Sequence, residues 1–390
     1  MIARIAIPII LATVLCYAYI DYVFWRKRFS WWKRVLAALL PLFIIGATWA
    51  MARIPFYFPE NIQTLTAYLH LLVCGVIAPS LFVVLHAGFS RLRPKRRWAV
   101  LLANTLVVGM PLAVVAGWAY GVKVGFYQFE VRHVELAFDD LPEAFDGYKI
   151  VQFSDAHVGT LVNKRASILQ RCVDSINAQH ADMVVFTGDM QNMLFSEITP
   201  HRELLSSVKA RDGVFAVMGN HDYAEYLDPE NMDSREKLQF AERTANEIEM
   251  LGWTLLCNSN RVVRRGDARL GIAGMHNDGE GRFPQWGKVQ DALLGLSRND
   301  FVVMLEHDPT SWRRKILKGC HAQLTLSGHT HGGQLELFGW SPASWIYREC
   351  DGLYELNGRK LYVSKGLAGV VPFRLGAPGE IVVITLKHKD

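Results

Sequence analysis

The chain has 390 residues, too many for one ordinary domain. Hydrophobic residues make up 51% and the mean hydropathy is +0.12, which is high for a soluble enzyme and indicates that part of the chain lies in a membrane. The net charge of +5 does not indicate a nucleic-acid partner, because the basic residues cluster near the first hundred positions, beside apolar segments. The six cysteines have neither CxxC nor zinc-ribbon spacing, and the sequence leaves their pairing open.

Four apolar segments lie within residues 1–122 and predict a domain of four transmembrane helices. They cover about residues 5–24, 35–52, 65–89 and 98–121, and each approaches or exceeds the roughly 20 residues that span a bilayer. The first segment resembles a cleaved signal peptide in length. It ends in Tyr19-Ile20-Asp21-Tyr22, however, and not in the small residues that a signal peptidase requires. We therefore expect it to be retained as a helix.

The basic residues also orient these helices. They follow the first and third apolar segments, whereas the loop between the second and third segments carries only Arg53 against Glu60. Basic loops face the cytoplasm in multi-pass proteins, so both chain termini are expected on the opposite side. The expected location is the inner (plasma) membrane, with the lipid bilayer as a partner and the C-terminal domain, residues 123–390, extracytoplasmic or periplasmic.

Short apolar runs separated by helical stretches begin after Gly121 and predict an α/β domain. Helices are expected at 164–179, where apolar residues recur at helical spacing, and at 232–251, which Gly252 ends. The dipeptide Thr199-Pro200 predicts a further helix start. Strands are expected at residues 129–138, 149–153, 183–187, 214–218, 270–273, 301–305, 324–326, 362–364 and 380–386.

Five of these strands are followed by side chains of the kind that bind metal ions. The carboxyl ends of strands are where ligands bind in open α/β sheets, so these side chains are expected to meet. Imidazole, carboxylate and amide oxygen together suit manganese, iron or zinc, with no soft sulfur to favour copper. The motifs are Asp155-Ala156-His157, Gly188-Asp189, Gly219-Asn220-His221-Asp222, Glu306-His307-Asp308 and Gly328-His329-Thr330-His331.

Each motif alone has an ordinary structural explanation. A lone Gly-Asp pair is usually a turn, and a single histidine such as His307 lies more often on a surface or in a core than on a metal ion. Five such motifs in succession, each closing an apolar run, are hard to obtain by accident. The sequence therefore favours a metal site.

In this order the motifs resemble the calcineurin-like metallophosphoesterase family, over about residues 124–390. The most specific parts are Gly219 to Asp222 and Gly328 to His331, while Tyr223, the longer run Leu326 to Gln334 and the segments 364–374 and 378–381 are similar to a membrane-anchored bacterial branch. The resemblance implies two facing β-sheets flanked by helices and two divalent metal ions, manganese, zinc or iron. It assigns one metal to Asp155, His157, Asp189 and His331, and the other to Asp189, Asn220, His307 and His329, with Asp189 bridging.

The resemblance also implies the chemistry. Two cations about 3.5–4 Å apart would hold a bridging hydroxide that attacks phosphorus in line, and they would offset charge on the phosphoryl oxygens. His221, which is not a ligand in this scheme, is the expected proton donor to the leaving alkoxide. Many relatives carry an aspartate where this chain has Asn192, and a neutral asparagine would support a charged His221 less well. Asp222 is a candidate to compensate. The loop from Gly274 to Asp278 is open to two interpretations, a substrate contact or a plain turn.

The expected function is a membrane-anchored, dinuclear-metal phosphoesterase, more specifically a phosphodiesterase acting on a lipid-linked or cell-envelope substrate. Within the enzyme class, the alternative is a pyrophosphohydrolase of a lipid-linked nucleotide such as UDP-2,3-diacylglucosamine, a substrate expected on the cytoplasmic side. From another class, the alternative is a sensor or transporter with a non-catalytic metal-binding domain. The complete ligand set disfavours this last alternative, since a domain without catalytic activity has no need to keep every ligand.

Overall fold

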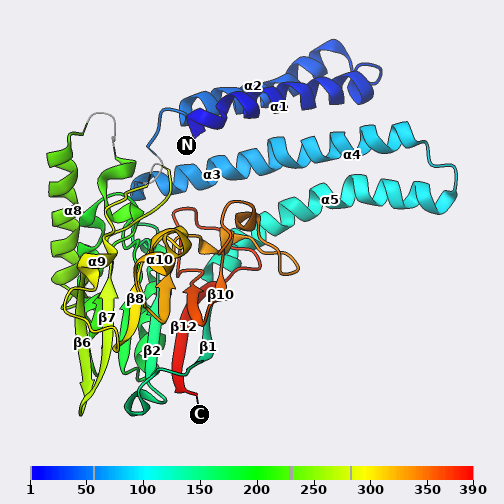
Figure 1. Cartoon of the computed structure of the whole chain (residues 1–390). Helices are drawn as coiled ribbons and strands as arrows, with labels where there is room; N and C mark the ends of the chain where they lie inside the picture. Colours follow the sequence, from blue (N-terminus) through cyan, green and yellow to red (C-terminus); the bar gives the residue numbers. More distant parts are fainter. Residues whose placement is uncertain (1, 56–57, 228–231, 282, 390) are drawn as a thin grey trace. The chain divides into compact units, whose positions relative to one another are not determined.

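The computed structural model describes residues 2–55, 58–227, 232–281 and 283–389. The chain divides into two compact units, an N-terminal unit that ends at Lys123 and a C-terminal unit whose main part begins at Val124 (Figure 1). Each unit is described below by itself.

The N-terminal unit consists of long apolar helices. Among the described residues, four helical segments are long and apolar enough to cross a membrane: Ile2–Trp25, Trp31–Met51, Pro59–Leu92 and Arg97–Tyr127. The first and third contain π-helical turns, at Asp21–Trp25 and Val73–Ile77. The regular helices are α1 (Ile2–Ile20), α2 (Trp31–Met51), α3 (Ile62–Leu72), α4 (Ala78–Leu92) and α5 (Arg97–Lys123). The expectation of four apolar helices is confirmed.

The C-terminal unit is built on two mixed sheets, each with six strands within the described residues. The strand order is β1-β12-β2-β3-β4-β5 in the first sheet and β10-β11-β9-β8-β7-β6 in the second. Their bounds are β1 (Phe129–Phe138), β2 (Lys149–Phe153), β3 (Met183–Phe186), β4 (Val214–Ala216), β5 (Thr254–Leu255), β6 (Ser259–Arg265), β7 (Ala268–Gly274), β8 (Phe301–Leu305), β9 (Leu324–Ser327), β10 (Gly352–Leu356), β11 (Arg359–Val363) and β12 (Gly379–His388).

Side-chain alternation along the strands creates three apolar layers. Ile150 of β2 belongs to a cluster that includes residues of both sheets, such as Val303 of β8, and this cluster is the core between them. The next residue, Val151, belongs to a cluster with the apolar faces of α6 (Ala166–Ala178) and α8 (Ser234–Glu249). A third cluster joins the second sheet to α9 (Val289–Ala292) and the π-helical turn Trp312–Ile316. The expected α/β sandwich of two sheets flanked by helices is confirmed.

Every strand predicted from the sequence is present, with small differences at the ends. β4 is shorter than expected, because regular pairing stops at Ala216. The helix expected from Thr199 is a 3-10 turn, Thr199–His201, followed by the short α7 (Arg202–Ser206), and Ile198 rather than Thr199 precedes the turn.

Parallel pairing determines where the polar motifs lie. β2, β3 and β4 run parallel in the first sheet, and β8 and β9 run parallel in the second. Parallel strands end at the same sheet edge, so the segments that follow these five strands come together.

Candidate metal centre

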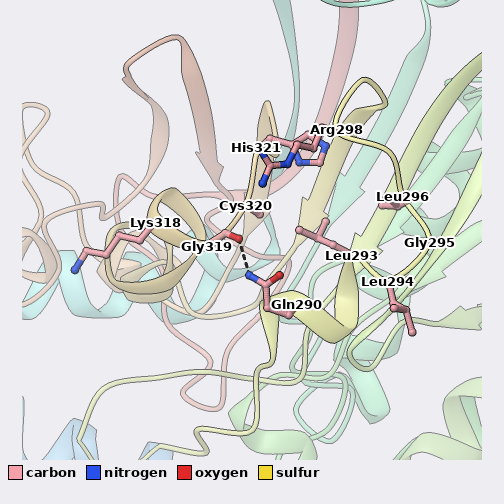
Figure 2. A pocket seen from close by; sticks show the side chains of 10 residues that line it. All are labelled: Gln290, Leu293, Leu294, Gly295, Leu296, Arg298, Lys318, Gly319, Cys320 and His321. Atoms are coloured by element: carbon pink, nitrogen blue, oxygen red, sulfur yellow. Dashed lines mark hydrogen bonds between the residues drawn. The ribbon is translucent and has the colours of Figure 1, made fainter.

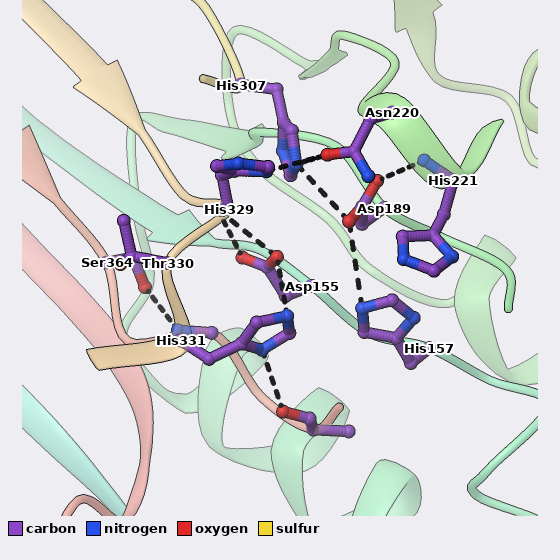
Figure 3. Close-up of polar contacts among 12 residues, drawn as sticks. Asp155, His157, Asp189, Asn220, His221, His307, His329, Thr330, His331 and Ser364 are labelled. Atoms are coloured by element: carbon purple, nitrogen blue, oxygen red, sulfur yellow. Dashed lines mark hydrogen bonds and ion pairs between the residues drawn. The ribbon is translucent and has the colours of Figure 1, made fainter. Parts of the chain in front are cut away.

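Seven side chains from the five strand-end segments converge in the C-terminal unit (Figure 3). They form two groups that share Asp189. In each group the candidate ligand atoms lie within 4.8 Å of one another. The first group contains Asp155, His157, Asp189 and His331, and the second contains Asp189, His307 and His329. These are the sets expected from the sequence, apart from the amide of Asn220.

Asp189 is the geometric link between the two groups. Its Oδ2 lies 3.3 Å from Nε2 of His307 and 3.7 Å from Nε2 of His157, which belong to different groups. In the first group, Nε2 of His331 lies 3.5 Å from Oδ1 of Asp155. A carboxylate placed in this way can offer an oxygen to two cations at once.

Asn220 completes the second group. Its Oδ1 lies 2.6 Å from Nδ1 of His329 and 3.2 Å from Nε2 of His307, and its Nδ2 donates to the hydroxyl of Tyr226 at 2.8 Å. The contact with Tyr226 directs the amide nitrogen away from the two histidines. The oxygen therefore faces the point on which both imidazoles converge.

The first group has an unsatisfied imidazole that fits a cation. His157 is fully buried, yet within the described part of the chain neither of its ring nitrogens has a hydrogen-bond partner. A buried polar group without a partner costs roughly 1–3 kcal/mol, so it calls for an explanation such as an ion. Nitrogen and oxygen donors in this mixture suit manganese, iron or zinc, and the residues present fit two divalent cations.

The backbone of the site adopts unusual conformations. Asp155, His157, Asp189, His329 and His331 all have positive φ angles, between 41° and 74°. Such angles are uncommon for residues other than glycine and are found where surrounding structure enforces them, often at functional sites.

Two glycines allow the close approach that this backbone requires. A Cβ at Gly188 would lie 2.6 Å from the backbone nitrogen of Gly219 and 2.7 Å from Nδ1 of His307. A Cβ at Gly366 would lie 2.5 Å from Cβ of Asp155. Both positions exclude any side chain, because the atoms that it would meet are backbone or candidate ligands.

Burial and charge act together on the protonation of the site. Burial, reinforced by the nearby His221, lowers the pKa of His157 far below its usual value. Burial also lowers the pKa of His329 and of His331. Burial alone would raise the pKa of Asp189, but the charges of His307 and His221 outweigh it and hold that pKa well below its usual range.

His307 differs from the other histidines of the site. Burial acts to lower its pKa, but the carboxylate of Asp189 outweighs burial and raises the pKa to about 10. In the absence of metal, His307 is therefore protonated at neutral pH and forms an ion pair with Asp189.

Metal loading is expected to release this proton. A metal ion binds neutral imidazole, so below pH 10 the cation must displace the proton of His307, and affinity should fall as the pH falls. Isothermal titration of the full-length protein with Mn²⁺ in buffers of different ionisation enthalpy would count the protons. We expect about one proton fewer for His307→Gln than for the parent chain, and no change for the exposed control His133→Gln. Equal proton release from His307→Gln and the parent would contradict this assignment.

His221 lies beside the two groups and not within them. Its backbone nitrogen donates to Oδ1 of Asp189 at 2.8 Å, and its ring stacks on Tyr226 with 4.1 Å between ring centroids. Nδ1 lies 2.7 Å from the backbone carbonyl oxygen of Asn192. Because a carbonyl only accepts, Nδ1 carries a hydrogen and donates it to Asn192, which fixes the orientation of the ring.

The structure corrects the expected role of position 192. The backbone carbonyl of Asn192 orients His221, while its side-chain Nδ2 donates to Oγ1 of Thr160 at 3.0 Å. Asp222 does not replace the missing aspartate either. Its carboxylate accepts the backbone N–H groups of Asp189, Met190 and Gly219, each at 2.9 Å, and so joins the segments that follow β3 and β4. Burial and the Asp189 charge raise the pKa of Asp222 to about 7.

Three residues outside the predicted ligand set contact His329. The hydroxyl of Tyr347 lies 3.0 Å from its Nε2, Oδ2 of Asp308 lies 3.5 Å from the same atom, and the ring of Phe283 meets it edge-on. Asp308 follows His307 in a recognised motif, so its position was a usable signal. Tyr347 and Phe283 lie far from any motif, so the sequence contained no signal of their contacts with His329.

The loop from Gly274 to Asp278 is held by internal contacts. His276 Nδ1 lies 2.7 Å from the hydroxyl of Tyr223, and the fully buried Asp278 pairs with Arg314 at 2.7 Å and with Lys315 at 2.5 Å. Of the two interpretations of this loop, the contacts favour a structural turn.

A surface depression elsewhere in the unit lies among residues 290–298 and 318–321 (Figure 2). It has a volume of about 540 Å³, and Gln290 donates to the carbonyl of Gly319 across it at 2.9 Å. Its lining contains one histidine, His321, one cysteine, Cys320, and no carboxylate. These two donors are fewer than the three or four protein ligands that a zinc site uses.

Comparison with known proteins agrees with the chemistry of the converging side chains. Residues 148–333 match the calcineurin-like phosphoesterase family. The chain is 30% identical, over 73% of its length, to a zebrafish "transmembrane protein with metallophosphoesterase domain", and spans 62% of the length of that relative. It is 29% identical over 76% of its length to a metallophosphoesterase of Bacillus subtilis, 96% of which is covered. The likeness therefore extends beyond bacteria.

Among solved structures, a dimetal phosphatase from zebrafish is 15% identical, with 62% of this chain and 99% of that chain covered and a TM-score of 0.33. The family match and the named relatives agree with the shared-carboxylate site described above. Residues 148–333 therefore form a domain that matches the calcineurin-like phosphoesterase family, in a chain whose N-terminal helices are apolar and long enough to cross a membrane.

Proposed function

We propose that this protein is a phosphodiesterase that uses two divalent cations and acts on a lipid-linked or cell-envelope phosphoester. The observation that carries the proposal is Asp189, which lies within reach of both donor groups. The first group also holds the buried imidazole of His157, which has no hydrogen-bond partner among the described residues. In this assignment Asp155, His157, Asp189 and His331 hold one cation. Asp189, Asn220, His307 and His329 hold the other.

The chain's own residues would divide the chemistry among them. When bound, the two cations would supply an activated water and withdraw charge from the phosphoryl oxygens. Asp189 holds His221 in place through the backbone N–H of that residue, and the carbonyl of Asn192 fixes the tautomer of its ring. As an imidazolium, His221 would then give the proton on Nε2 to the leaving oxygen and keep the one on Nδ1.

The role of His221 predicts a dependence on the leaving group. Replacing His221 with alanine should lower kcat about 10²–10⁴-fold for an alkyl phosphodiester, whose alkoxide needs a proton, and far less for a nitrophenyl ester, whose anion leaves unaided. Asn192→Ala is the matched control. It keeps the backbone carbonyl that orients His221 and loses only the contact with Thr160, so a decrease of less than about tenfold is expected for both substrates. An equal loss on both esters in His221→Ala would exclude the proton-donor role.

The membrane attachment supports the choice of substrate. Four apolar segments keep the phosphoesterase domain at a bilayer, where lipid-linked phosphoesters are concentrated. The basic loops that follow the first and third segments favour a domain outside the cytoplasm. A reporter fused to the C-terminus tests this orientation. Activity of a reporter that works only in the cytoplasm would overturn it and would favour hydrolysis of a lipid-linked nucleotide pyrophosphate.

Activity is tested with the full-length chain, purified in detergent and loaded with Mn²⁺. Hydrolysis of a chromogenic phosphodiester is compared with that of the matching monoester, and then with a phosphodiester lipid in mixed micelles. We expect the diesters to be turned over faster than the monoester. Faster monoester turnover would make the protein a phosphatase, and no turnover by folded protein that binds two metals per chain would refute the enzymatic proposal.

A further inference from the structure

An exposed apolar loop follows the last candidate metal ligand. We define the aromatic loop as residues 335–348, which lie between β9 and β10. Phe338 is fully exposed, and Trp345 and Ile346 are each 78% exposed. Large apolar side chains gathered in this way on a soluble surface usually mark a binding surface.

The tip of the aromatic loop is a tight turn with an unusual residue. Leu337 and Trp340 exchange both of their backbone hydrogen bonds, at 2.9 and 3.0 Å, and the two residues between them have positive φ angles, 54° for Phe338 and 78° for Gly339. Such turns favour asparagine, aspartate or glycine at both central positions. Phenylalanine is therefore disfavoured here by its backbone and by its contact with water. Both costs would be offset if the tip lay in an apolar medium.

The aromatic loop is firmly attached to the metal centre. At its start, Glu336 pairs with Lys365 at 2.6 Å. In its middle, the hydroxyl of Ser341 donates to the carbonyl of Gly332 at 2.8 Å. At its end, Tyr347 contacts His329. These contacts therefore hold the tip of the loop, and any surface that it binds, near the metal centre.

The composition of the loop indicates a lipid surface. From Leu337 to Arg348 the sequence contains no aspartate or glutamate. The side chain of Arg348 lies 3.8 Å from the buried Glu349 and is 76% exposed. The rings of Trp340 and Trp345 lie 5.0 Å apart. Tryptophan prefers the interface between headgroups and acyl chains, and a nearby cation is attracted to anionic headgroups. A bilayer is also the medium in which the same chain is anchored.

We propose that the aromatic loop inserts Phe338, Trp345 and Ile346 into the headgroup–acyl boundary of a bilayer. This contact is a second attachment of the protein, separate from its transmembrane helices. It would hold the entrance of the metal centre at the membrane surface, where a phosphoester of a lipid headgroup can reach it. Because lipid contact is measured without turnover, the proposal stands or falls independently of the proposed reaction.

The test places a fluorophore at the tip of the loop in the full-length protein. Phe338→Cys is labelled with an environment-sensitive dye and reconstituted in nanodiscs of phosphatidylcholine with one quarter phosphatidylglycerol, and lipids carrying a nitroxide on the acyl chain are the quencher. Leu294→Cys is the matched control, because Leu294 is an apolar residue that is 80% exposed in another loop of the same unit. The parent chain, labelled in the same way, gives the background from its native cysteines.

We expect the nitroxide lipids to quench the dye at position 338 at least about three times as strongly as the dye at position 294, as for a residue buried at the boundary between headgroups and acyl chains. Ile346→Cys should behave like Phe338→Cys, and it provides a second reading if the substitution at the tip disturbs the turn. Equal quenching at positions 338 and 294 would overturn the proposal. A dye response that rises with protein concentration, without nitroxide quenching, would also overturn it and would assign the loop to contact between copies of the chain.

Discussion

Replacing Asp189 with asparagine should lower metal-dependent phosphoester turnover by more than about 100-fold, since even residues outside a ligand set cause losses of 10–100-fold at metal sites. Asparagine has nearly the same shape, so Oδ1 can still accept the backbone N–H of His221. The substitution removes the negative charge that lies 3.3 Å from His307 and is shared by both donor groups. The variant should therefore fold while at least one cation is lost.

Three measurements on the full-length protein separate the causes. Metal content, measured by mass spectrometry, should fall from two ions per chain toward one. The value of kcat/KM should fall by the factor given above, and the Tm of the metal-free protein should change little. Asp267→Asn, in the exposed turn between β6 and β7, is the matched control and should leave all three unchanged. An Asp189→Asn protein that kept two metals and its turnover would rule out the shared-carboxylate site.

The central strands were predictable because burial on both faces leaves a nearly continuous apolar run. β2 and β8 were predicted with the bounds that the structure shows, and all their residues except Lys149 are buried. The edge strands of the second sheet were not predicted. β6 contains Arg261, Arg264 and Arg265 and lies at one end of its sheet, and the half-exposed β10 lies at the other. Edge strands carry charged residues and adjoin turns, and both conceal the alternation of apolar and polar residues by which a strand is predicted.

The metal site was predictable for a related reason. Each candidate ligand follows a strand directly, so predicting the strand also placed the ligand at its carboxyl end. Contacts made by residues outside the motifs depend on chain packing, and sequence spacing does not encode them. The hydroxyl of Tyr226 reaches Asn220, and that of Tyr347 reaches His329 from a loop beyond β9. At position 192 the prediction concerned the side chain of Asn192, but the backbone carbonyl of that residue makes the contact with His221.

Replacing Arg374 with methionine should destabilise the C-terminal unit by about 3–5 kcal/mol, the cost of leaving buried polar groups without their charged partner. Arg374 is 1% exposed. Burial lowers its pKa to about 10, so it stays charged at neutral pH. Its guanidinium donates to five backbone carbonyls, those of Lys365, Gly366, Ala368, Ala377 and Pro378. Methionine would leave all five facing an apolar side chain.

The effect should reach the metal centre, because the carbonyl of Ala368 lies 3.2 Å from Nδ1 of His331 and orients that imidazole toward Asp155. At temperatures where the variant is folded, Mn²⁺ affinity should fall about 10–100-fold, as for other groups that orient a metal ligand. Arg374→Lys keeps the charge but not the planar fork, so it should recover part of the stability and affinity. The exposed Arg298→Met should change stability by less than about 0.5 kcal/mol. Loss of stability in Arg374→Met with unchanged metal affinity would restrict Arg374 to folding. Loss of both would make Arg374 the residue through which the segment from Lys365 to Pro378 positions His331.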